Sequence, residues 1–247
     1  MNTIEGALKR IVLVISTCNQ SEMLSAMLAS LGQTRTPRGY ELHTLFFDDQ
    51  SVDEDVAVLA REYLLTHPGS ALACVHHQHC AASMNQFLGH GFLGLGADVV
   101  VWVHVDMAFP DPDWLIELLQ MRAARPRAGK IASENTVGPE STAPNGSGTD
   151  RPGHNGPYLV TREAFEHVTG KYGHAFDPAF EGYAGWDDWD FNAKLLEGGF
   201  EVLIAGRSRV YHRGSGTRAN QAYASDEMAR RNQCRYYERW KTWAAPV

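Results

Sequence analysis

The chain has 247 residues, of which 44% are hydrophobic and 21% are charged. This length and apolar content are enough to bury a substantial core, as one large domain or two small ones. The formal net charge of -7 excludes a general attraction to nucleic acid or anionic lipid, although it is compatible with a local basic patch.

The four cysteines, Cys18, Cys74, Cys80 and Cys234, lack the spacing of a disulfide framework or a CxxC site. We therefore expect reduced thiols, as in a cytoplasmic protein. The first residues do not resemble a signal peptide, and the longest apolar run, Val99–Val103, is too short to cross a bilayer. The expectation is a cytoplasmic protein, with peripheral attachment to a membrane left open.

The first half alternates short β-branched runs with helical periodicities, which is typical of βα units around a mostly parallel sheet. Strands are predicted at Ile11–Ser16, Leu42–Phe47, Ala71–Val75 and in the run Val99–Asp106. Apolar stripes predict helices around Met23–Leu31, Val56–Leu64, Ala81–Leu93 and Trp114–Leu119. The sequence therefore predicts an α/β fold with a Rossmann-like central sheet flanked by helices.

The alternation breaks after Lys130–Ala132. Residues Ser133–Pro157 are rich in Gly, Pro, Ser, Thr and Asn and have no apolar period, which predicts a long loop. Loops of this length are usually functional lids or disordered segments. Beyond the loop, strands are predicted at Tyr158–Thr161 and Glu201–Ala205, and helices at Arg162–Val168 and Asp187–Leu196.

The polar tail Ala219–Trp243 is predicted to be helical and combines arginines with aromatic residues. One interpretation is a surface for oligomerisation or for nucleic acid. We favour an amphipathic helix whose arginine stems lie over the core. There is no repeat and no clean domain linker, and a homo-oligomer through this helix is left open.

The run Val99–Asp106 ends in a polar His-x-Asp tip. In an open α/β sheet, the carboxyl end of such a strand faces the ligand crevice. Residues two apart in a strand point the same way, so His104 and Asp106 should enter one space. An aspartate beside a diphosphate oxygen suits Mg²⁺ or Mn²⁺, and a nearby imidazole favours Mn²⁺. Taken alone, Asp106 indicates a metal ligand and His104 a hydrogen-bonded structural histidine.

Acids also follow the second predicted strand, in Asp48–Asp53. Carboxylates at this edge can accept hydrogen bonds from a base or from ribose hydroxyls. The alternative is an N-cap for the helix that begins near Asp53. The residues by themselves leave both interpretations open.

Three acids, Asp187, Asp188 and Asp190, crowd the start of a predicted helix, whose dipole stabilises them. Like charges raise the pKa of at least one carboxyl group, which suits a general base. N-capping accounts for one of these acids but not for three that are interleaved with Trp186 and Trp189.

His212 ends an apolar run and precedes Arg213 and a glycine-rich segment. A histidine there can complete a metal shell, and Arg213 can reach phosphate oxygens. As an isolated residue, His212 is more simply a structural histidine. The histidines within His76–Cys80 match no usual four-ligand zinc spacing, so we do not expect zinc there.

Taken in order, these motifs resemble those of the GT-A glycosyltransferases, specifically the inverting family 2 enzymes. The resemblance covers about residues 11–216 and rests on the order of the motifs. Val14–Asn19 resembles the first-strand motif, Asp48–Asp53 the nucleotide motif, Ala81–Asn85 the Ala-Arg-Asn helix, His104–Asp106 the Asp-x-Asp metal motif, Gly185–Asp190 the acidic catalytic motif and Val210–His212 the histidine that closes the metal site.

The resemblance implies one GT-A domain over residues 1–247, with a nucleotide-sugar half to about 110, an acceptor and catalytic half over about 111–216 and a helical tail over 217–247. It implies inverting transfer of a sugar from a nucleoside-diphosphate sugar, with UDP-sugars foremost. The acceptor would be a hydroxyl of a glycan, a glycolipid or another molecule, with a nucleic-acid base as a minor alternative.

The resemblance also implies residue roles. Asp188 would be the general base, and Asp106 and His212 would bind Mn²⁺ or Mg²⁺. Nucleotide-sugar contacts would come from Ser16, Asn19, Asp49, Asn85, His104 and Arg213. Sugar or acceptor contacts would come from Trp186, Asp187 and Trp189, and the loop Ser133–Pro157 could close over the donor.

Departures from the family pattern leave other functions open, and Cys18 and Gln50 are among the residues that differ from the usual ones. His104 replaces the first acid of Asp-x-Asp, and His77–His79 replaces a glycine-bearing element. A catalytically inactive module that binds sugar nucleotides or glycans is therefore one alternative. A nucleotidyltransferase is another, but it should carry a glycine-rich basic loop after the first strand, and Ser16–Asn19 has none.

Overall fold

The computed structural model describes residues 8–49, 51–67, 69–75, 80–153, 156–182, 184–214 and 225–241. Within them lie nine strands: β1 (Lys9–Thr17), β2 (Tyr40–Asp49), β3 (Ala71–Val75), β4 (Val99–His104), β5 (Met107–Ala108), β6 (Ala128–Asn135), β7 (Arg151–Pro152), β8 (Tyr158–Thr161) and β9 (Glu201–His212). The α-helices are α1 (Ser21–Leu31), α2 (Glu54–Thr66), α3 (Cys80–Gly89), α4 (Trp114–Ala124), α5 (Arg162–Tyr172), α6 (Asp187–Glu197) and α7 (Asp226–Arg239), and a π-helical turn, His90–Gly94, follows α3.

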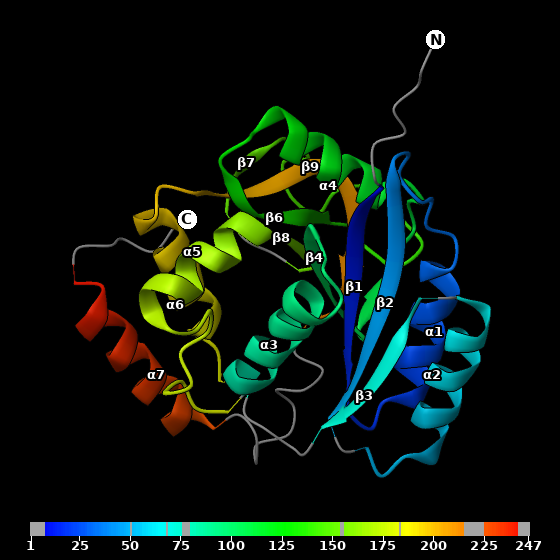
Figure 1. Ribbon diagram of the computed structural model, residues 1–247, viewed down its shortest axis with the longest axis horizontal. Helices are drawn as coiled ribbons and strands as arrows, with labels where there is room; N and C mark the ends of the chain where they lie inside the picture. Colours follow the sequence, from blue (N-terminus) through cyan, green and yellow to red (C-terminus); the bar gives the residue numbers. More distant parts are fainter. Residues whose placement is uncertain are drawn as a thin grey trace.

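The strands form one mixed sheet in the order β3-β2-β1-β4-β8-β6-β9-β5, with β7 paired to β9 (Figure 1). The first four strands in this order are parallel, as the βα alternation predicts. β8 runs antiparallel to both β4 and β6, so the complete sheet is mixed. The carboxyl ends of β1, β2 and β4 therefore lie at one edge, where ligands bind in open α/β sheets.

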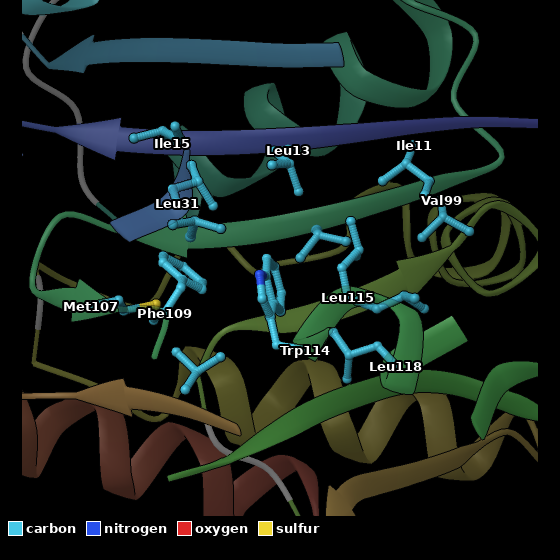
Figure 2. Close-up of a cluster of buried hydrophobic side chains, with 14 of the residues drawn as sticks. Ile11, Leu13, Ile15, Leu31, Val99, Met107, Phe109, Trp114, Leu115 and Leu118 are labelled. Atoms are coloured by element: carbon cyan, nitrogen blue, oxygen red, sulfur yellow. The ribbon is translucent and has the colours of Figure 1, made fainter. Parts of the chain in front are cut away.

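Both faces of the sheet are covered by helices. On β1, Ile11, Leu13 and Ile15 pack in one cluster with α1, α2 and α4, while Val12 and Val14 pack in another with α3, α5 and α6. Figure 2 shows the first cluster, in which Trp114 projects from α4 toward β1 and β4. The Trp114 indole is fully buried and donates a hydrogen bond to Thr34 Oγ1 at 2.8 Å. The middle of β1 is buried continuously, because neighbouring side chains point to opposite faces of the sheet and both faces are covered.

The chain departs from the predicted strand before it reaches Asp106. β4 ends at His104, and Val105 and Asp106 form a turn into β5. β5 pairs antiparallel with the end of β9, where Met107 lies opposite His212. This reversal overrides the continuing apolar pattern. The predicted strand Glu201–Ala205 and the apolar run that ends at His212 are parts of the single strand β9.

The predicted loop Ser133–Pro157 begins inside β6, and its described part is attached to β9. β7 pairs with β9, and the Thr136 amide donates to the Val210 carbonyl at 3.1 Å. The buried Glu134 carboxylate forms an ion pair with Arg151. The Gly206 amide donates to Asp150 Oδ1 at 2.8 Å. These contacts fasten residues 136–153 along the strand that carries His212.

The C-terminal helix α7 lies outside α6, at the end of the molecule away from β2 and β3 (Figure 1). It begins at Ser225, whose hydroxyl accepts a hydrogen bond from the Met228 amide, and it buries Tyr236 and Trp240 in a third apolar cluster with α6. This is the amphipathic helix that the tail predicts. None of the described helices is long and apolar enough to span a membrane.

Candidate active site

A cavity of about 200 Å³ lies beside the carboxyl end of β4. Five elements, β4, β6, β8, α6 and the end of β9, supply most of its walls. Its lining consists of Trp102, His104, Lys130, Gly156, Tyr158, Asp188 and His212. Three of the sequence-predicted site residues, His104, Asp188 and His212, therefore meet at one cavity.

Asp106 lies beside this cavity, in contact with a residue of its wall. His212 Nε2 is 3.3 Å from Asp106 Oδ1, and the Arg213 amide donates to the Asp106 carbonyl at 3.1 Å. Burial works to raise the pKa of Asp106, but the hydrogen bond from His212 and the nearby imidazoles outweigh it and hold the pKa below its usual value. The carboxylate is therefore ionised at neutral pH.

His104 is half-buried between aromatic rings. Its ring centroid lies 3.9 Å from that of Trp102 and 5.5 Å from that of His212, with which it stacks. Burial, together with repulsion from His212, lowers the pKa of His104 to about 4. The imidazole is therefore neutral at neutral pH and can both donate and accept a hydrogen bond in the cavity.

The carboxylate of Asp106 and the imidazole of His212 form a donor pair suited to a divalent metal. Oxygen and imidazole ligands are both compatible with Mn²⁺, and Mg²⁺ is usually held by one or two carboxylates plus substrate phosphates. Among the described residues, no group of three or more His, Cys, Asp or Glu side chains has the geometry of a metal site. A metal here would have two protein ligands and would take its remaining ligands from a bound diphosphate and water.

Asp188 is positioned by the irregular start of α6. Trp186 precedes the helix with a left-handed backbone (φ 76°), and Asp187 is 7% exposed. The Asp188 side chain is 39% exposed and faces the cavity. Its Oδ1 lies 3.4 Å from Lys130 Nζ and 3.4 Å from the Tyr158 hydroxyl, which donates to it. The Asp188 carboxylate thus faces the cavity, and Lys130 and Tyr158 hold one of its oxygens in place.

Two of the three acids of the motif, Asp188 and Asp190, have different tasks. Asp190 is fully buried and turned away from the cavity, with Lys194 Nζ at 2.8 Å, the Arg239 guanidinium at 2.9 Å and the Trp240 indole at 2.8 Å. Helix residues two apart do not share a face, so Asp188 and Asp190 point to different neighbours. Asp190 anchors α7, and Asp188 faces the site.

The two tryptophans of the motif pack toward α7. The Trp186 ring centroid lies 5.4 Å from that of Tyr236, 5.6 Å from that of Tyr237 and 6.3 Å from that of Trp189. Neither tryptophan is part of the described cavity lining. Both remain partly exposed at the junction of α6 and α7, beside the cavity rather than in it.

The predicted nucleotide contacts lie at the ends of β1 and β2. Ser16 pairs with His104 across the sheet, and its hydroxyl accepts a hydrogen bond from the Trp102 indole at 3.2 Å. Asp49 ends β2 and is 4% exposed. Asp53 is the N-cap of α2, with Oδ1 accepting from the Asp55 amide, so the capping interpretation is right for that residue.

Two predicted contacts have other partners in the structure, and a third is exposed. The Asn19 side chain accepts hydrogen bonds from the Val52 and Asp53 amides and so joins the β1–α1 and β2–α2 loops. Asn85 uses both groups of its amide on the backbone of Phe176. Arg213 is exposed at the end of β9. None of the three belongs to the described cavity lining.

Sequence reasoning missed Lys130 and Tyr158, which also line the cavity. The sequence pattern marks these two residues only weakly as site residues, because Tyr158 begins a short apolar strand and Lys130 lies within a run of small and apolar residues. The histidines at 76–79, Gln50 and the glycine-rich segment Ser215–Thr217 lie outside the described residues.

Many solved structures have a similar fold, and three of them are compared with this chain. The mannosyltransferase PcManGT from Pyrobaculum calidifontis, in complex with GDP-Man and Mn²⁺, matches with a TM-score of 0.66 and 17% identity over 98% of this chain and 67% of its own. GalNAc-T7 with UDP, GalNAc and Mn²⁺ matches with a TM-score of 0.70 and 15% identity over 95% of this chain and 49% of its own. Residues 1–349 of S. aureus TarS match with a TM-score of 0.61 and 11% identity over 95% of this chain and 72% of that chain.

These matches show that the chain has the GT-A fold, as the order of its motifs implied. The chain spans about half of the GalNAc-T7 chain and about two thirds of the mannosyltransferase chain. No protein-family model and no curated protein sequence matched it.

Proposed function

We propose that this protein is an inverting, metal-dependent glycosyltransferase that moves a sugar from a nucleoside-diphosphate sugar to an acceptor hydroxyl. One observation carries the proposal. In a GT-A fold, a partly exposed carboxylate, Asp188, opens onto the same cavity as His212, which contacts Asp106. This reaction needs a base and a metal-binding pair, and here the proposed base lies on the cavity and the proposed pair lies at its edge.

The nature of the donor is supported by the bound ligands of the similar structures. The mannosyltransferase holds GDP-Man and Mn²⁺, and GalNAc-T7 holds UDP, GalNAc and Mn²⁺. By analogy, the nucleotide lies across the ends of β1 and β2, with Ser16 and Asp49 near base and ribose. Arg213, exposed beside Asp106, is placed to reach phosphate oxygens. UDP-sugars are the first candidates.

Asp106 and His212 would hold Mn²⁺ or Mg²⁺. Such an ion, when bound, supplies positive charge that stabilises the departing nucleoside diphosphate. Asp106 suits this position because its carboxylate is ionised at neutral pH. His104, neutral beside the pair, would donate a hydrogen bond to the donor rather than bind the metal.

Asp188 takes the proton of the acceptor hydroxyl. The acceptor oxygen forms a bond to the anomeric carbon from the face opposite the diphosphate, the carbon–oxygen bond to the diphosphate breaks, and the bond's electron pair leaves with the diphosphate. One displacement inverts the configuration. Trp186 and Trp189 border the acceptor side and present aromatic surface to a glycan, a glycolipid or another hydroxyl acceptor.

The test is turnover of nucleotide sugars. The protein is incubated with Mn²⁺ and UDP-glucose, UDP-GalNAc or GDP-mannose, and the released nucleoside diphosphate is quantified by chromatography. We expect release with at least one donor, lowered about 10²–10⁴-fold in Asp188→Asn with donor binding retained.

Release of nucleoside diphosphate by Asp188→Asn at near the wild-type rate would show that Asp188 is not the base. Saturable donor binding without release would support the inactive binding module, an alternative that His104 at the metal motif suggests. Chemistry that depends on pyrophosphate would support a nucleotidyltransferase.

A further inference from the structure

Lys130 brings a buried ammonium group to the cavity from the middle of the sheet. It lies on β6, and its side chain is 1% exposed. Its neighbours along the strand, Gly129 and Ile131, are buried as well. A charged group in such a place is costly unless it is paired and hydrogen-bonded.

Lys130 has three polar or aromatic partners, of which Asp188 and Tyr158 line the cavity. Nζ donates to Asn192 Oδ1 at 3.1 Å, lies 3.4 Å from Asp188 Oδ1 and is 3.8 Å from the centre of the Tyr158 ring. The ring face attracts the cation. The same tyrosine donates its hydroxyl to Asp188 Oδ1 at 3.4 Å. One ammonium and one hydroxyl thus converge on a single oxygen of the proposed base.

We propose that Lys130 is a positioning residue that fixes the Asp188 carboxylate at the cavity wall and is its counter-charge until the carboxylate takes the proton of the acceptor. This inference rests on the proposed function. Burial lowers the pKa of Lys130, and Asp188 opposes that change, so each group favours the charged form of the other. An ionised base held in one orientation is ready to accept a proton from the acceptor hydroxyl.

Other titratable groups face the pair and are part of its electrostatics. Asp187 on α6 acts on Lys130, and His104 on β4 interacts with Asp188 across the cavity. Tyr158 on β8 and His212 at the end of β9 line the same cavity. Lys130 is the cation that lies nearest to Asp188 among the contacts that the structure shows for it.

The chain offers a matched control in Lys194. It is also fully buried and also pairs with an aspartate of α6, because its Nζ lies 2.8 Å from Asp190. It donates to the Ala175 carbonyl and is not part of the described cavity lining. Lys130→Met and Lys194→Met therefore both remove a buried cation, and only the first removes one beside Asp188.

The first measurement is the titration of Asp188 itself, which does not depend on turnover. Carboxyl signals are recorded by NMR in protein labelled with ¹³C-aspartate, and the Asp188 signal is assigned by its loss in Asp188→Asn. We expect Lys130→Met to raise the pKa of Asp188 by about one unit or more and Lys194→Met to leave it unchanged. An unchanged Asp188 titration in folded Lys130→Met overturns the inference.

A reciprocal measurement applies if Lys130→Met does not fold. Coupling between two groups acts equally in both directions. Asp188→Asn, at a partly exposed position, should therefore lower the pKa of Lys130, observed through its ¹³Cε signal in lysine-labelled protein. A Lys130 titration that is the same in wild type and Asp188→Asn contradicts the inference.

The second measurement is the pH profile of donor turnover. We expect the acidic limb of kcat/KM in Lys130→Met to move to higher pH by the change seen in the Asp188 titration, with kcat reduced and the donor KM little changed. Lys194→Met should keep the wild-type profile. Wild-type protein without turnover overturns the proposed function. Normal turnover with an unmoved profile in Lys130→Met overturns only the role of Lys130.

Discussion

His212 Nε2 lies 3.3 Å from Asp106 Oδ1, and a two-residue strand is what brings them together. β5 leaves the turn at Asp106 and pairs antiparallel with the end of β9, so Met107 lies opposite His212. The backbone of Arg213 closes the arrangement by donating to the Asp106 carbonyl. The proposed metal pair is thus built by strand pairing between distant parts of the chain.

Removal of His212 should weaken metal binding. His212→Ala leaves Asp106 as the single proposed protein ligand, so we expect the affinity for Mn²⁺ in the presence of UDP to fall at least about tenfold. Free Mn²⁺ is measured by electron paramagnetic resonance. His174→Ala is the control, because His174 lies near Asp177 and outside the described cavity lining. Equal Mn²⁺ affinity in wild type and His212→Ala would exclude the pair as the metal site.

Asp190 should be a stability residue rather than a catalytic one. Asp190→Asn leaves Lys194 and Arg239 without the buried carboxylate that they share, which should lower the free energy of unfolding by about 3–5 kcal/mol. Urea denaturation measures the loss. Asp188→Asn also leaves a buried cation, Lys130, but its carboxamide keeps an oxygen for Lys130 and Tyr158 and the side chain is 39% exposed to water, so its loss should be smaller. Comparable losses in the two variants would contradict the division of tasks between these acids.

The ion pair between Asp177 and Arg239, which also holds α7, should weaken in acid. Burial works to raise the pKa of Asp177, but hydrogen bonds from the Ala179 amide and from Arg239 outweigh it and hold the pKa below 3.8. The stabilisation from this carboxylate is therefore complete above pH 3.8 and is lost as the pH falls through the lower folded-state pKa. The difference in unfolding free energy between wild type and Asp177→Asn should shrink over that range. A difference that is constant between pH 7 and pH 3 would contradict this assignment.

Attachment of residues 136–153 to β9 should be sensitive to Gly206. A Cβ at this position would overlap the backbone of Thr149, which lies directly against β9. We expect Gly206→Ala to lower the free energy of unfolding by about 1–3 kcal/mol and to speed amide exchange in β7. Gly138→Ala, in the same loop with nothing within 4 Å of the added Cβ, is the control. Equal free energies of unfolding for the two variants would contradict close packing of Gly206 against the Thr149 backbone.

The sequence was a good guide to elements whose pattern is local. Leu13 and Val14 on β1 alternate between the two faces of the sheet, and the stripe of α1 places Leu24 and Met27 in the core. The turn at Asp106 could not be foreseen in this way, because Val105 continues the apolar pattern of β4. Pairing of β5 with β9 decides it, and that pairing is not local.

The candidate site could also be predicted only in part, because some of its contacts depend on non-local packing. The motifs predicted that Asp188, His212 and His104 would be neighbours, because strand ends and helix starts of this fold share an edge, and in the structure the three side chains line one cavity. Lys130 was missed since a lysine in a strand usually reaches solvent, whereas both faces of β6 are covered. The separation of Asp188 from Asp190 follows from helix period and was open to prediction.

The configuration of the first sugar product tests most directly whether transfer inverts the anomeric carbon with Asp188 as the base. With an α-linked donor such as UDP-glucose and Mn²⁺, ¹H NMR can follow the anomeric proton of the product, formed on an acceptor or on water, before mutarotation mixes the anomers. We predict that wild type forms the β anomer first and that Asp188→Asn forms it about 10²–10⁴-fold more slowly. Initial formation of the α anomer, or an unchanged rate in Asp188→Asn, would contradict inversion with Asp188 as the base.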